Sequence, residues 1–78
     1  MHSTATTAAI RGPYIELYKL LKREDVAASG GEAKAMISEG LIRVNGEVET
    51  RKRKKIVARD TVEYHGGRIT VIFVEEKE

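Results

Sequence analysis

Residues 29–46 read SGGEAKAMISEGLIRVNG, and this stretch decides the fold. Its first half predicts a helix. Ser29 and Glu32 form a capping box, in which each side chain accepts a backbone N–H at the helix start. Gly40 supplies the left-handed residue that commonly ends a helix. The apolar residues between and beside them recur at helical spacing: Ala33, Met36, Ile37 and Leu41.

The second half of the stretch predicts a β-hairpin. After Gly40 the pattern changes to a period of two, with Ile42 and Val44 alternating with Arg43. Asn45-Gly46 then gives the strongest short hairpin signal, because both turn residues must adopt positive φ. Further on, residues 61–64 and 69–74 predict two more strands, joined by a turn at His65-Gly66-Gly67.

Upstream of residue 29, the sequence predicts one more helix. Tyr14, Leu17, Tyr18 and Leu21 recur at helical spacing over about nine residues. Because Pro13 precedes them, we expect residues 1–12 to form a disordered tail and residues 76–78 a charged C-terminal end. The predicted fold class is α+β: two N-terminal helices followed by a small antiparallel sheet, in one domain over residues 13–75.

Composition excludes several classes of function. The 78 residues contain no cysteine, which excludes a disulfide framework, a thiolate zinc site and a cysteine nucleophile. His2 and His65 do not form a metal pair, and the adjacent acids Glu24-Asp25 and Glu75-Glu76 lie on connecting or terminal segments. We therefore expect no catalytic residues, no metal and no cofactor. No apolar run approaches the ~20 residues that span a bilayer, so we expect a cytoplasmic monomer without membrane contact.

The charge distribution points to a polyanionic partner. Between Arg43 and Arg59 the net charge is +5, whereas the other residues together carry −3. Five adjacent bases, Arg51-Lys52-Arg53-Lys54-Lys55, repel one another unless an anion neutralises them. In a loop they would extend into solvent and could follow a phosphate backbone. A solubilising loop and a nuclear import signal are the alternatives.

The stretch also resembles a known family. Ser29, Ala33, Ile37, Gly40, Val44, Asn45 and Gly46 match, without a gap, the pattern S-R-x-x-A-x-x-x-I-x-x-G-x-V-x-V-N-G of the ribosomal protein S-four-type RNA-binding domain, or αL motif. Asp60 and Val62 match its later G-D-x-V element. The short bacterial YbcJ-like subfamily is similar in its Gly-Gly-Glu-Ala-Lys segment and its basic run. Two departures from the pattern matter: Gly30 replaces an arginine and Arg59 replaces a glycine.

The resemblance implies non-catalytic binding of structured RNA, ribosomal or transfer RNA, beside the second helix and the adjoining hairpin, in ribosome assembly or association. The predicted RNA-binding residues are Lys34, Arg43, Asn45, Arg51, Lys52, Arg53, Lys54, Lys55 and Arg59. Three of the four aromatic side chains fit apolar stripes and are expected in the core, which argues against a stacking single-strand binder. Because Gly30 removes one expected phosphate contact, a module of the same fold that docks an acidic protein surface is the alternative.

Overall fold

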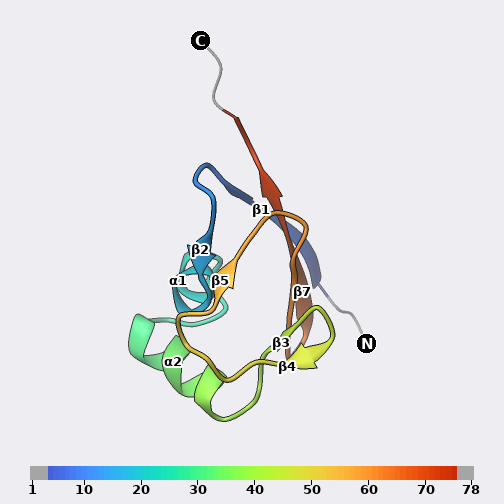
Figure 1. Cartoon of the computed structure of the whole chain (residues 1–78). Helices are drawn as coiled ribbons and strands as arrows, with labels where there is room; N and C mark the ends of the chain where they lie inside the picture. Colours follow the sequence, from blue (N-terminus) through green and yellow to red (C-terminus); the bar gives the residue numbers. More distant parts are fainter. Residues whose placement is uncertain (1–3, 76–78) are drawn as a thin grey trace.

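The computed structural model describes residues 4–75 as an α+β fold with helices on one side of a sheet (Figure 1). Its elements, in chain order, are β1 (Thr4–Ile10), β2 (Ile15–Glu16), α1 (Leu17–Arg23), α2 (Gly30–Ser38), β3 (Arg43–Val44), β4 (Glu47–Val48), β5 (Lys55–Ile56), β6 (Thr61–Tyr64) and β7 (Gly67–Phe73).

The main sheet is mixed. Its strand order is β1-β7-β6-β3-β4, with β1 parallel to β7 and the other pairs antiparallel. A separate two-stranded ribbon pairs β2 with β5. The α+β class is therefore confirmed. The predicted order, in which the helices come first and an antiparallel sheet follows, holds only for the chain from α1 onward. Two strands precede the helices, and one of them makes the sheet mixed.

The N-terminal segment is a strand, so the prediction of a disordered tail is wrong for residues 4–10. This strand, β1, pairs with the full length of β7 and buries Ala8 and Ile10 in the core. The guanidinium of Arg23, at the end of α1, donates to the carbonyl of Ala9. Gly67 permits the close approach of β1, because a Cβ there would lie 2.9 Å from the Thr4 carbonyl oxygen. Residues 1–3 and 76–78 lie outside the described residues.

The second helix begins and ends as predicted. The Glu32 amide donates to Ser29 Oγ at 3.1 Å, and the Glu32 carboxylate accepts from the Ala28 amide at 3.0 Å, one residue before the expected donor. Gly40 has φ +78°, in the left-handed region. The Asn-Gly hairpin is confirmed too, since Asn45 and Gly46 have φ of 52° and 88° between the paired strands β3 and β4.

The first helix begins later than predicted. It starts at Leu17, because Ile15 and Glu16 pair with the ribbon strand β5. No side chain caps α1. Its first amides, those of Leu17 and Tyr18, instead donate to the carbonyls of Lys54 and Lys52 at 2.9 and 3.1 Å. These bonds satisfy donors that a helix start would otherwise leave unpaired.

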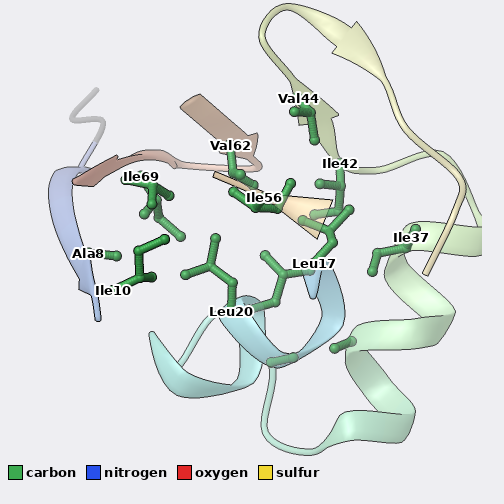
Figure 2. Packing of buried hydrophobic residues seen from close by; sticks show 14 residues of the cluster. Ala8, Ile10, Leu17, Leu20, Ile37, Ile42, Val44, Ile56, Val62 and Ile69 are labelled. Carbon is green, nitrogen blue, oxygen red and sulfur yellow. The ribbon is translucent and has the colours of Figure 1, made fainter. Parts of the chain in front are cut away.

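The core lies between the helices and the main sheet (Figure 2). Leu17 and Leu20 of α1 and Ile37 of α2 are fully buried. They pack against side chains of the ribbon and the sheet, among them Ile56, Val62 and Ile69. Two residues of the predicted apolar stripes, Tyr14 and Leu41, lie instead at the surface, and Phe73 is exposed as well.

Candidate nucleic-acid interface

The basic segment, residues 51–55, is held against the fold and does not extend freely. Lys55 is part of β5, opposite Glu16 of β2. The carbonyls of Lys52 and Lys54 accept the first amides of α1. The predicted basic loop is confirmed for residues 51–54, and the side chains of the segment lie at or near the surface, but Lys55 belongs to a strand. Four of them line an open hollow of about 400 Å³: Arg51, Arg53, Lys54 and Lys55.

The ring of Tyr18 brings cations from separate elements together. Lys34 Nζ, from α2, lies 4.6 Å from the ring centroid, and the Arg53 guanidinium carbon lies 5.1 Å from it. Lys19 Nζ, from α1, lies 5.9 Å away. Cations at these distances are attracted to the negative face of an aromatic ring. Lys34 and Arg53 of the basic segment, which are about twenty residues apart in the chain, thus both contact the ring of Tyr18.

One carboxylate lies among these cations. Glu16 Oε1 accepts from Arg53 Nη1 at 3.3 Å and forms an ion pair with Lys19 at 3.4 Å. Arg53 Nη1 also lies 3.4 Å from the hydroxyl of Tyr18. At the other end of β2, Lys55 Nζ lies 4.8 Å from the ring centroid of Tyr14. We call the side chains of Lys34, Lys52, Arg53, Lys54 and Lys55 the cationic surface.

Arg51 differs from Arg53 in its ion pair, because Arg51 has a carboxylate to itself in a two-point contact, whereas Arg53 shares Glu16 with Lys19. Its Nε and Nη2 donate to the two carboxylate oxygens of Glu49, each at 2.9 Å. The Arg51 amide also donates to Glu49 Oε2 at 2.9 Å. These hydrogen bonds lower the pKa of Glu49 from 4.5 to about 2 and raise the pKa of Arg51 above its usual value.

Glu49→Gln tests this pair through the pH dependence of stability. A carboxyl whose pKa is lower in the folded state stabilises the fold above its unfolded pKa, and this stabilisation disappears as pH falls through the folded value. We expect the wild type to exceed the variant in denaturant midpoint at pH 6, and the difference to shrink between pH 4.5 and about 2. Other carboxyls titrate in both proteins, so the difference isolates Glu49. A difference that does not change with pH would contradict the pairing.

Asn45 uses its side chain inside the protein. Its Nδ2 donates to Asp60 Oδ1 at 3.0 Å, and its Oδ1 accepts from the Thr61 amide at 2.9 Å. Asp60 Oδ2 in turn accepts from the Val57 amide at 2.9 Å. The family positions Asn45 and Asp60 therefore connect the hairpin turn to the turn between β5 and β6. We leave Asn45 out of the proposed contact surface, although the sequence predicted it as an RNA contact.

Asn45→Ala is expected to lower stability and to leave RNA affinity unchanged while the protein is folded. It removes two hydrogen bonds, worth about 0.5–1.5 kcal/mol each, so we expect a loss of roughly 1–3 kcal/mol in the free energy of unfolding. Urea denaturation measures this loss. Asn45→Gly also removes the two hydrogen bonds, but glycine adopts the positive φ of the turn easily. Comparing the two variants therefore separates the cost of the lost hydrogen bonds from the cost of a strained turn. If the Asn45→Ala variant were fully folded and bound RNA more weakly than the wild type, Asn45 would be a direct RNA contact.

Arg43 and Arg59 lie apart from the cationic surface. Val44 points into the core, so the alternation of β3 directs Arg43 to the outer face of the sheet, which the helices do not cover. There it lies in one cross-strand row with Glu63 and Arg68. Arg59 lies in the turn between β5 and β6, where its amide donates to the carbonyl of Val71 in β7 at 2.7 Å. Its φ of 78° keeps the left-handed conformation for which the family uses glycine.

Within residues 4–75, no group of three or more His, Asp or Glu side chains is placed to hold a metal ion. In the same part of the chain, no helix is long and apolar enough to cross a membrane.

The capped helix α2 and the Asn-Gly hairpin of this small α+β domain are the elements that carry the pattern of the S-four-type RNA-binding domain. The model of the S4 domain family matches residues 8–72, and the chain belongs to this family.

Relatives of similar size support the assignment. The chain is 47% identical to "Putative RNA-binding protein YbcJ" of Escherichia coli (strain K12) over 68 residues, which cover 87% of this chain and 97% of that protein. It is 39% identical to "Probable ribosome maturation protein RlbA" of Bacillus subtilis (strain 168) over 62 residues, 80% of this chain and 87% of that protein. The solution structure of Escherichia coli YbcJ, described as having an αL motif involved in RNA-binding, aligns with a TM-score of 0.67 at 46% identity, covering 85% of each chain.

Proposed function

We propose that this protein binds structured RNA without catalysing a reaction, as a cytoplasmic monomer, through the cationic surface. The observation that carries the proposal is the grouping of Lys34, Arg53 and Lys55 around the exposed side of β2 and α1. Several cations fixed on one surface suit a phosphate backbone, which supplies much of the affinity for RNA. We propose ribosomal or transfer RNA as the ligand and ribosome assembly or association as the process. The name of the Bacillus subtilis relative, a probable ribosome maturation protein, supports this context.

The alternative partner is an acidic protein surface. Gly30 favours it, since the arginine of the family pattern would add a phosphate contact there. A Cβ at position 30 would lie 3.8 Å from the Tyr18 ring, an ordinary contact distance. Nucleic acid that copurifies with the protein, seen as a high ratio of absorbance at 260 to 280 nm, favours RNA over the protein partner.

The experiment that tests the proposal is binding of the purified protein to total cellular RNA, with double-stranded DNA as competitor, at two salt concentrations. We expect binding that resists the DNA and weakens as salt rises, because phosphate contacts release counterions. Equal displacement by DNA would show a general affinity for polyanions. Absence of RNA binding at low salt would refute the proposal and leave the acidic protein partner.

A further inference from the structure

Tyr14 exposes its ring beside the cationic surface. The side chain is 43% exposed, although its helical spacing predicted a core position. Ile56 of β5 is fully buried and its partner Ile15 packs against the core, so the alternation of the two strands directs Glu16 and Lys55 outward. Tyr14, two positions before Glu16, lies on that same outer side, and its ring contacts Lys55.

The two tyrosines of this surface have different surroundings. Tyr18 is partly buried, and three cations from three segments lie within 6 Å of its ring, so this ring serves to position cations. Tyr14 has one cation, Lys55, and a large exposed area. A single exposed aromatic residue needs no explanation by itself. Tyr14 differs because it adjoins a row of cations that can bind the phosphates on either side of a base.

We propose that Tyr14 stacks on one unpaired base of the bound RNA while Lys55 and Arg53 contact the neighbouring phosphates. The inference rests on the proposed RNA binding and specifies its ligand: RNA in which an unpaired nucleotide adjoins a helix, as in a bulge or a helix–loop junction. Aromatic side chains stack on bases that have left the helical stack, and each such contact contributes substantially to affinity. A base within a continuous helix has both faces covered by its neighbours and cannot take this position.

Two RNA hairpins test the proposal. They share one sequence, except that one carries an added uridine opposite a 2-aminopurine, so that this base is bulged from the stem in one hairpin and paired within it in the other. We expect the wild type to prefer the bulged hairpin and to change its 2-aminopurine fluorescence. Tyr14→Ala should weaken binding of the bulged hairpin roughly tenfold, the loss of one stacked base, and leave the paired hairpin unchanged. Tyr14→Phe keeps the ring and should bind like the wild type.

Phe73→Ala is the matched control, because it removes a ring that is 52% exposed on β7, outside the cationic surface. We expect it to affect neither hairpin, and thermal melting verifies that each variant is folded. Equal losses on both hairpins for Tyr14→Ala, or a wild type without preference for the bulge, would overturn the stacking role. If the wild type binds neither hairpin at low salt, RNA binding itself fails, and that result is seen before any variant is made.

Discussion

Replacing Lys34, Arg53 and Lys55 together by Gln is expected to remove most of the salt-dependent RNA binding. The three cations come from α2 and the basic segment, and each lies within about 5 Å of a tyrosine ring on one surface. Each lost phosphate contact lowers the slope of log K against log salt by about 0.7, so the slope should become shallower by roughly 2. The affinity at low salt should fall on the order of 100-fold, as measured by filter binding across a salt series.

The matched control removes the same number of charges elsewhere. Arg43, Arg59 and Arg68 lie on the outer face of the sheet or in the turn between β5 and β6, and their joint replacement by Gln keeps the net charge equal to that of the first variant. Screening at ordinary salt, with a Debye length of ~10 Å, limits the influence of charges that do not contact the RNA directly. We expect this variant to bind RNA within about threefold of the wild type. Equal losses in both variants would mean that net charge, and not the cationic surface, governs binding.

Deleting residues 1–12 is expected to leave a chain that is largely unfolded at 25 °C. The deletion removes the whole of β1, exposes the free edge of β7 and takes Ala8 and Ile10 from the core. Losing a buried Ile side chain alone costs about 2–5 kcal/mol. A domain of this length has a total stability of about 4–12 kcal/mol, so the deletion removes much or all of it. Circular dichroism during urea denaturation measures the effect.

Point variants within β1 show whether the deletion acts by removing buried side chains or merely by shortening the chain. Ile10→Ala, at a buried position, should lower the free energy of unfolding by about 2–5 kcal/mol. Thr6→Ala, at an exposed position of the same strand, should change it by less than about 0.5 kcal/mol. If the deleted chain unfolded at the same urea concentration as the full chain, β1 would not contribute to the fold, and the N-terminal segment would behave as the tail that its sequence predicted.

Features that depend on close neighbours in the chain were predictable. The capping box of Ser29 and Glu32, the helix stop at Gly40 and the Asn45-Gly46 turn each involve residues within a few positions of one another. Local backbone preference and local hydrogen bonds specify them, so the sequence pattern is sufficient. The pattern also identified the basic segment and the family, because both are read from adjacent residues.

The N-terminal strand could not be read from its own residues. Residues 4–10 are Thr, Ala and Ile, without the alternation of large apolar and polar residues that marks a strand. The strand forms because β7, more than sixty residues later in the chain, offers it a free edge and an apolar surface. The same reason explains the late start of α1, since Ile15 and Glu16 pair with β5 and not with the helix that follows them.

The sequence by itself therefore determined the helix α2, the hairpin, the family and the identity of the basic residues. Only the tertiary structure decided which of these bases act together. It placed Lys34 beside Arg53 on the ring of Tyr18, balanced Arg51 with Glu49, and directed Arg43 to the other face of the sheet. The physical reason is that a charged surface is made by contacts between segments distant in the chain, and such contacts depend on how the core packs.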